Sequence, residues 1–213
     1  MKIKSKLLFA FTLLTLSSIT LLYSCSKTNE GSTLGCDNKT ENYPLTTLEK
    51  NQIPYRGHDT IRLVSNSGET IDCIGKGIQS FNTRDFVKHS NPACGPNGTE
   101  KLYGGNKFEF VDSLKNVIIQ LENYRFYPDQ PYKSSSIVAI SFKNRKFFFL
   151  TNQISNPDAY NYVGDIEVRG INFLAVTKES LTGDTTNFLL LNKTNGIIKI
   201  QINQNETWEL LKN

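Results

Sequence analysis

Residues 188–210 read FLLLNKTNGIIKIQINQNETWEL and contain three strand-like runs separated by two turns. The Asn195-Gly196 dipeptide in the first turn is typical of a short β-hairpin. After this turn, apolar residues alternate with polar ones at Ile198, Ile200 and Ile202. Because successive side chains of a strand point to opposite faces, this period of two predicts antiparallel strands with one buried face.

The same pattern recurs in the rest of the chain between clusters of turn residues. Further alternating runs include residues 61–63, 71–73, 108–110, 117–121, 138–142, 147–149, 166–168 and 171–175. Only residues 47–51 and Thr83–His89 offer short helices, the second with Asn82 or Thr83 as its cap. The sequence therefore predicts an all-β fold of about ten strands with at most one or two short helices. We expect an antiparallel meander, forming either a sandwich or a strongly curved half-barrel sheet.

One strand carries aromatic residues on both of its faces. Phe147, Phe148 and Phe149 are consecutive, so their side chains must point alternately to the two sides of the sheet. Aromatic side chains are usually buried, so this pattern predicts a central strand covered on both sides.

The N-terminus has the three parts of a secretory signal. Three lysines precede an apolar run over residues 7–22, and this run is followed by Tyr23-Ser24-Cys25. The run is shorter than the about 20 apolar residues that span a bilayer, which favours a cleaved signal over an uncleaved anchor. A Cys directly after the cut resembles the lipobox of bacterial lipoproteins, in which this Cys is acylated and becomes the mature N-terminus.

This reading divides the chain into three parts. We expect a lipoprotein signal peptide over residues 1–24, a lipidated flexible tether over 25–35 and a single β domain over 36–213, with an acyl chain such as palmitate attached to Cys25. Removing the signal takes away three lysines and no acidic residue, which lowers the formal net charge from +4 to +1. No cluster of Lys and Arg remains that would indicate a nucleic-acid partner.

Both ends of the chain resemble a known class of proteins. The lipobox, the polar tether and two C-terminal motifs look like small envelope lipoproteins of Bacteroidota; the motifs are Asn195-Gly196-Ile197-Ile198-Lys199-Ile200 and Glu206-Thr207-Trp208-Glu209-Leu210. The resemblance implies a protein held by lipid in the outer membrane, on its periplasmic or its cell-surface side. Many such proteins have no assigned activity, so the resemblance implies no particular function.

Three cysteines remain beyond the lipobox. In an oxidising compartment, Cys36, Cys73 and Cys94 predict one disulfide and one unpaired thiol. Cys73 ends an apparent strand and Cys94 lies in a loop dense in turn residues, so we predict a Cys73–Cys94 disulfide. Cys36–Cys94 is the alternative, since Cys36 could tie the tether to the domain.

The sequence contains no recognised catalytic or metal-binding motif. The HExxH, CxxC and GxSxG patterns are absent, and His58 and His89 both lie beside polar loop residues. We therefore expect no catalytic residue, no metal and no cofactor, and we do not expect an enzyme.

Aromatic residues gather near two prolines in one predicted loop, at Tyr124, Phe126, Tyr127 and Tyr132. Such rings could stack on sugars or hold a peptide, so we expect loops 91–106 and 124–136 to form a contact surface. The leading hypothesis is a lipid-anchored envelope protein that acts by binding or structural association with a glycan, a peptide or an envelope protein. One alternative is a carrier of lipid or acyl ligands. The other is a glycan hydrolase with two carboxylates, such as Asp165 and Glu167.

Overall fold

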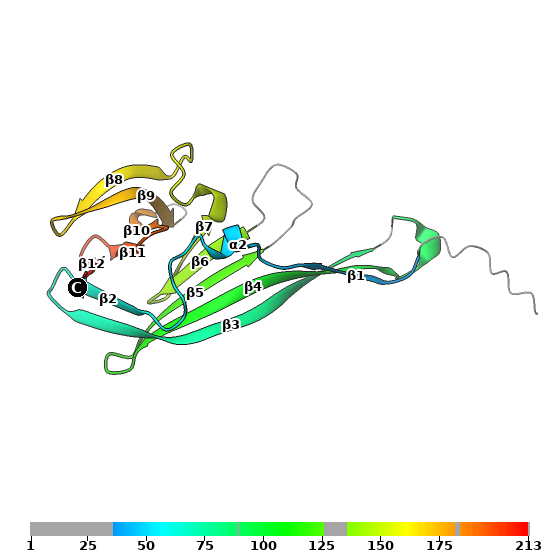
Figure 1. The fold of residues 1–213 in the computed structure, drawn as a ribbon, viewed down its shortest axis with the longest axis horizontal. Coiled ribbons are helices and arrows are strands. Elements are labelled where there is room, and N and C mark those ends of the chain that lie inside the picture. The colour runs from blue at the N-terminus through cyan, green and yellow to red at the C-terminus, as the bar shows by residue number, and fades with distance from the viewer. Residues whose placement is uncertain (1–35, 89, 126–135, 182–183, 213) are drawn as a thin grey trace, which may run out of the picture. The chain divides into compact units, whose positions relative to one another are not determined.

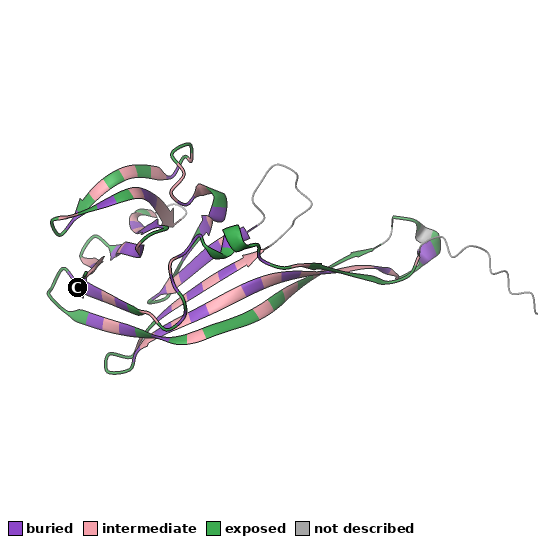
Figure 2. Cartoon of the chain, viewed as in Figure 1, coloured by how far each residue is buried: buried purple, intermediate pink, exposed green. Residues whose placement is uncertain are grey.

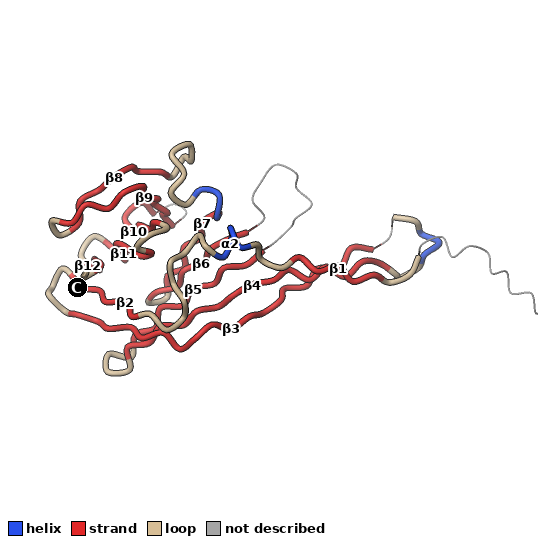
Figure 3. The backbone as a smooth tube through the Cα atoms, viewed as in Figure 1, coloured by secondary structure: helices blue, strands red, loops and turns tan. Residues whose placement is uncertain are grey.

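Twelve strands form one sheet in the computed structural model, which describes residues 36–88, 90–125, 136–181 and 184–212 (Figure 1, Figure 3). The strands are β1 (Lys39–Tyr43), β2 (Thr60–Ser65), β3 (Thr70–Lys88), β4 (Gly98–Asp112), β5 (Val117–Arg125), β6 (Ser136–Phe142), β7 (Arg145–Leu150), β8 (Tyr162–Val168), β9 (Ile171–Leu181), β10 (Asp184–Asn192), β11 (Gly196–Asn203) and β12 (Glu206–Leu210). Within these ranges, the helical elements are α2 (Thr47–Lys50) and two 3-10 turns, Pro92–Cys94 and Thr151–Gln153. The predicted all-β class is confirmed.

The strand order shows two runs of consecutive antiparallel hairpins. Strands β2 to β7 follow one another in space, as do β8 to β12, and β1 pairs with β4. The two runs join where β12 pairs with β2, with Trp208 opposite Ser65 and Leu210 opposite Leu63. The predicted meander is therefore confirmed within each run. The last strand, β12, completes the sheet by pairing with β2.

Contacts along the chain divide it into two compact units. One comprises residues 1–39 and 87–99, and the other comprises residues 40–86 and 100–213. The described part of the first unit contains the 3-10 turn Pro92–Cys94 and a disulfide. The second unit contains the apolar core.

The main core lies on one face of the curved sheet. Most of its members come from β2 to β7 and from β10 to β12, and Ile53, Tyr55 and Ile154 come from loops. The largest fully buried side chains among them are Phe110, Phe142, Phe147, Phe149 and Trp208. Strands β7 and β9, from opposite runs of hairpins, also lie against each other. The sheet therefore curves around its own apolar face, and Figure 2 shows buried residues recurring along its strands.

A second, smaller cluster lies on the other face of β10 and β11. It consists of Val168, Phe173, Val176, Leu190 and Ile198. The alternation predicts that Ile198, Ile200 and Ile202 share a face, and this is wrong for Ile198. The register between β10 and β11 shifts between Leu190 and Leu191, where a β-bulge adds a residue and reverses which side chains face the main core.

The two predicted helices have different outcomes. The turn near 47–51 is confirmed as α2, where Thr46 and Glu49 form a reciprocal capping box. The helix predicted over Thr83–His89 is wrong, because β3 extends through Lys88. Residues of β3 obtain their backbone hydrogen bonds from the neighbouring β4, and this pairing overrides the local helix signal.

The prediction for Phe147–Phe149 is half right. Phe147 and Phe149 are buried in the main core, but Phe148 is 50% exposed. Strand β7 pairs with β6 and ends the strand order, so it is an edge strand and not a central one.

Candidate functional site

An open cleft of about 610 Å³ lies where two hairpin turns meet the sheet. One turn joins β4 to β5 and the other joins β6 to β7. The lining residues are Glu69, Lys115, Asn116, Val117, Ile118, Gln120, Ser141, Phe142, Lys143 and Asn144. Pockets that bind small ligands have volumes of about 300–1,000 Å³, so this cleft is large enough to hold one.

The β4–β5 turn is fixed by the carboxylate of Asp112. Its Oδ1 accepts hydrogen bonds from the backbone N–H groups of Leu114 and Lys115, both at 3.0 Å. Its Oδ2 accepts one from the N–H of Asp72, also at 3.0 Å. The hydrogen bond from Asp72 and those from the turn hold the pKa of Asp112 below its usual value. The wall that carries Lys115 and Asn116 is therefore held in place while Asp112 is ionised.

The β6–β7 turn has two residues, Lys143 and Asn144. Both have positive φ, 43° and 59°, as a type I′ hairpin requires. Asn116 in the other turn also has a positive φ, 53°. Asn tolerates this conformation better than most residues, so local backbone geometry places two carboxamides at the cleft.

Each lysine at the cleft is held by a glutamate. The Lys115 Nζ lies 2.9 Å from Glu69 Oε1, and the Lys143 Nζ lies 2.6 Å from Glu206 Oε1. The Lys143 ammonium also lies 4.5 Å from the centre of the Trp208 ring. Trp208 Nε1 donates to the same Glu206 oxygen at 2.8 Å. The hydrogen bonds from Lys143 and Trp208 lower the pKa of Glu206.

The cleft presents both hydrogen-bonding groups and apolar surface. Its lining combines carboxamides, ammonium groups and a hydroxyl with the apolar side chains of Val117 and Ile118. Glu69 is the one carboxylate among the lining residues, and it is ion-paired with Lys115. A two-carboxylate hydrolase needs a second acid facing the first across the cleft, and this lining supplies none.

The predicted aromatic contact loop falls largely outside the described residues. Phe126, Tyr127 and Tyr132 lie outside them, as does Cys25, the predicted site of lipid attachment. Tyr124 belongs to β5 and packs beside Phe81, with ring centroids 6.2 Å apart, and it does not line the cleft. The other predicted loop, 91–106, ends at Asn97 because β4 begins at Gly98.

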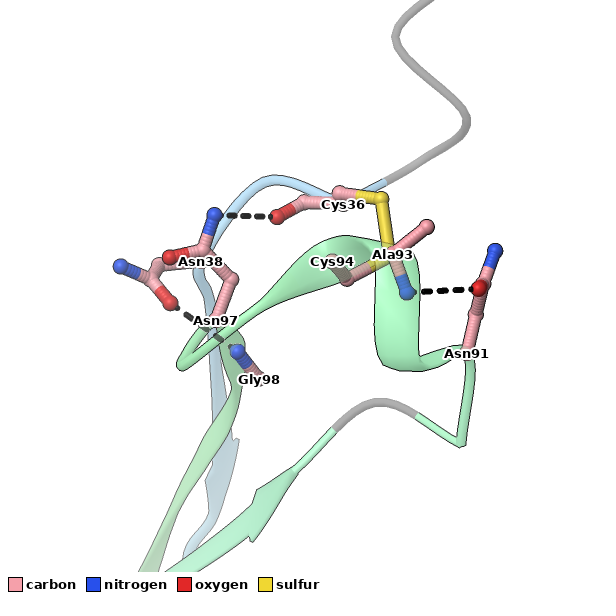
Figure 4. The surroundings of a disulfide bond; sticks show 7 residues. All are labelled: Cys36, Asn38, Asn91, Ala93, Cys94, Asn97 and Gly98. Atoms are coloured by element: carbon pink, nitrogen blue, oxygen red, sulfur yellow. Dashed lines mark hydrogen bonds between the residues drawn. A yellow bond between two sulfur atoms is a disulfide. The ribbon is translucent and has the colours of Figure 1, made fainter.

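The predicted Cys73–Cys94 disulfide is wrong. Cys94 is bonded to Cys36, with Cα atoms 5.1 Å apart (Figure 4). The prediction placed Cys73 at the end of a strand, but β3 continues through Lys88 and carries the chain on by about 3.3 Å per residue. Cys73 faces the main core with no solvent exposure, and burial raises the pKa of its thiol to about 11. The alternative that tied Cys36 to Cys94 is the one that the structure contains.

Two asparagines reinforce this disulfide within the first unit. Asn97 Nδ2 donates to the carbonyl oxygen of Cys36 at 2.8 Å, and the N–H of Gly98 donates to Asn38 Oδ1 at 3.0 Å (Figure 4). Residues 36–38 are therefore held to residues 94–98 by one covalent bond and two hydrogen bonds.

The lysines of the cleft were not found from the sequence. Lys115-Asn116 and Lys143-Asn144 are recognisable as hairpin turns, but the ends of two hairpins meet only in the folded sheet. No group of three or more His, Cys, Asp or Glu residues in the described ranges could hold a metal ion. Likewise, none of the helices formed by these residues is long and apolar enough to cross a membrane. Comparison with protein-family models, with curated proteins and with solved structures finds no match.

Proposed function

We propose that this chain is a lipid-anchored envelope protein that acts by binding, and that the cleft holds part of an envelope glycan. The observation that carries the binding role is the lining of the cleft, in which hydrogen-bonding groups surround a small apolar patch. The lipid anchor on Cys25 rests on the signal and lipobox pattern of the N-terminus.

The anchor would place the protein at the outer membrane, on the periplasmic or the cell-surface side. An acyl chain on Cys25 holds a protein to a bilayer surface and leaves the domain to fold in water. Partners that share this compartment, including polysaccharides, peptides and other envelope proteins, are then the ligands to consider.

The chemistry of the lining favours a glycan among these. Sugars present many hydroxyl groups, and the carboxamides of Asn116, Gln120 and Asn144 can donate to and accept from them. Ile118 is 47% exposed and offers an apolar surface to the C–H face of a sugar ring. The two ion-paired lysines add donors without leaving a strong net charge, which suits a ligand that is polar and nearly neutral.

The packing of the interior gives no support to the carrier alternative. The side chains that would contact an acyl chain on the concave face, such as Phe110, Ile119 and Phe149, are fully buried against one another. A lipid would have to displace them, whereas the cleft is open to solvent.

The test is binding of the purified full-length protein, in detergent, to immobilised envelope polysaccharides, with a peptide array in parallel. Asn116→Gly and Asn144→Gly remove the carboxamides at positions whose positive φ suits glycine. Losing two hydrogen bonds of about 1 kcal/mol each should weaken glycan binding by about tenfold or more in the double variant.

Arg169→Gly is the matched control, since Arg169 also has a positive φ, 55°, and does not line the cleft. The control should bind glycan as the unaltered protein does. Glycan binding that is unchanged in the double variant would place the site elsewhere. Binding to peptides alone would replace the glycan as the ligand.

A further inference from the structure

The second half of β3 has backbone pairing on one side only, among the described residues. Strand β2 pairs with Thr70–Ile74 of β3. Two further backbone hydrogen bonds follow on that side, from Gly75 to Asp59 at 2.9 Å and from Gly77 to Gly57 at 2.8 Å. Beyond them, the strand order gives β3 no other neighbour than β4. We call residues 78–86 the β3 edge.

The β3 edge has little of the usual protection of a free strand. Edge strands are commonly kept from pairing with other chains by being short, by charged side chains, lysine above all, or by proline. Strand β1 is short, and β7 carries two positive charges, Arg145 and Lys146. The nine residues of the β3 edge include neither Lys nor Pro, and their two charged side chains, Arg84 and Asp85, have opposite signs. Most of this stretch is exposed (Figure 2), and its two ends carry half-exposed apolar side chains, Ile78 at 49% and Phe86 at 48%.

The sequence of the edge matches itself in one antiparallel register. A two-fold axis at Asn82 sets Ile78 of one copy opposite Phe86 of the other, and Ser80 opposite Arg84. Apolar residues then meet apolar residues at both ends, and no like charges face each other, which is the arrangement that stabilises cross-strand pairs.

Other registers of the edge are poorer. An axis at Arg84 would set two arginines against each other, and an axis at Phe81 would set Ile78 opposite Arg84. An axis at Thr83 would set Ser80 opposite Phe86. The register centred on Asn82 is therefore the self-complementary one.

We propose that residues 78–86 of β3 pair with the same residues of a second copy of this chain, antiparallel and about a two-fold axis at Asn82. The pairing continues the sheet from one copy into the next through backbone hydrogen bonds, with Ile78 and Phe86 packed together at each end. An interface of this length buries less than the about 1,200 Å² of a stable standard complex, so the dimer is weak and is best captured by cross-linking. The inference rests on neither the lipid nor the glycan.

The test is disulfide cross-linking of the full-length protein in the cells that produce it. In Asn82→Cys, the new cysteines of two copies face each other across the axis, with Cβ atoms about 4.5–5.5 Å apart. In the control Gln79→Cys they are six strand positions apart, about 20 Å. Mild oxidation should therefore give about tenfold or more dimer for Asn82→Cys than for Gln79→Cys. The native Cys73 thiol is fully buried and does not compete.

A second pair of variants tests whether the cross-link comes from the proposed register or from random encounters between copies. Ile78→Lys, in the Asn82→Cys background, places a charge opposite Phe86 and should reduce the dimer band strongly. Phe148→Lys is the control, because Phe148 is equally exposed at 50% and lies on β7. Equal cross-linking at positions 79 and 82, no cross-linking at 82, or a dimer that survives Ile78→Lys would each overturn the proposal. Glycan binding at the cleft should be unchanged in every variant.

Discussion

Gly196 meets two structural requirements at once. Its φ of 72° is in the left-handed region that favours glycine, and a Cβ at this position would overlap the phenol of Tyr55. The buried Tyr55 hydroxyl oxygen accepts a hydrogen bond from the N–H of Ile197 at 2.8 Å. Gly196 of the hairpin dipeptide Asn195-Gly196 therefore also leaves the space that the buried Tyr55 ring occupies.

Replacing this glycine should separate the two requirements. Gly196→Ala should lower the free energy of unfolding by about 2–4 kcal/mol, from backbone strain and overlap with Tyr55 together. Gly170→Ala is the matched control: its φ is 74°, but nothing lies within 4 Å of its Cβ position, so a loss of about 1 kcal/mol is expected. Urea unfolding measures the loss of unfolding free energy in both variants. Equal losses would show that overlap with Tyr55 adds nothing to the cost of a Cβ at position 196.

Glu179 is a half-buried acid in β9 that receives a hydrogen bond from Asn161 Nδ2 at 3.2 Å. Burial raises the pKa of its carboxyl, and the bond from Asn161 offsets this only in part. Because the folded-state pKa lies above the unfolded one, the contribution of Glu179 to stability is greatest below the unfolded pKa. It is lost as pH rises through the folded pKa.

The variant Glu179→Gln should therefore be more stable than the parent at pH 7, by about 1 kcal/mol or less. The gain should shrink towards zero at pH 4, where the parent carboxyl is increasingly protonated. Urea unfolding at both pH values checks this, with Glu167→Gln on the exposed surface of β8 as the control. A Glu179→Gln protein that is less stable at pH 7 would contradict the account.

At the scale of elements, the sequence predicted hairpins well where turn residues and alternation agree. The strand–turn–strand pattern of 188–210 gives β10, β11 and β12, and the alternation before it gives most of the other strands. The sequence-based prediction failed at Thr83–His89, where pairing with β4 decides the structure. It also failed at Phe148. Alternation shows which face of the sheet a side chain is on, but it does not show whether another layer covers that face.

The cleft and the Cys36–Cys94 disulfide were also not predicted, because both depend on how strands distant in the sequence pair. The cleft forms from turns about thirty residues apart in sequence, which lie together only after four strands have paired in order. The choice of disulfide depended on where β3 ends, and strand ends are the least predictable feature of a sequence pattern.

The Cys36–Cys94 bond should stabilise the first unit, residues 36–39 and 87–99, locally. It closes a loop with a sequence separation of 58, for which the lost entropy of the unfolded chain corresponds to about 4 kcal/mol. In a Cys36→Ser, Cys94→Ser double variant, hydrogen exchange of backbone amides should become faster in residues 90–99, with 100–125 and 136–181 unchanged.

Cys73→Ala is the control for this experiment and should leave exchange in residues 90–99 unaltered. Unchanged exchange there in the double variant would show that the disulfide is dispensable. Peptide mapping that found Cys73 in a disulfide would contradict the pairing itself.

At the scale of the whole molecule, the fold joins an N-terminal and a C-terminal run of hairpins through the β2–β12 pair. The paired residues, such as Glu209 and Val64, are about 145 positions apart, so the sheet is complete only after the last strand has been made. The proposed lipid at Cys25 and the proposed glycan site at the hairpin turns then belong to different parts of the chain.

The most direct test of this account is a native mass spectrum of the protein extracted from its own membrane. The account predicts a chain that begins at acylated Cys25 and is lighter by two hydrogens for the Cys36–Cys94 bond. It also predicts a bound glycan that is retained only under native conditions. A chain that begins at Met1 and carries no lipid would contradict the anchor and with it the envelope location from which the ligand was inferred.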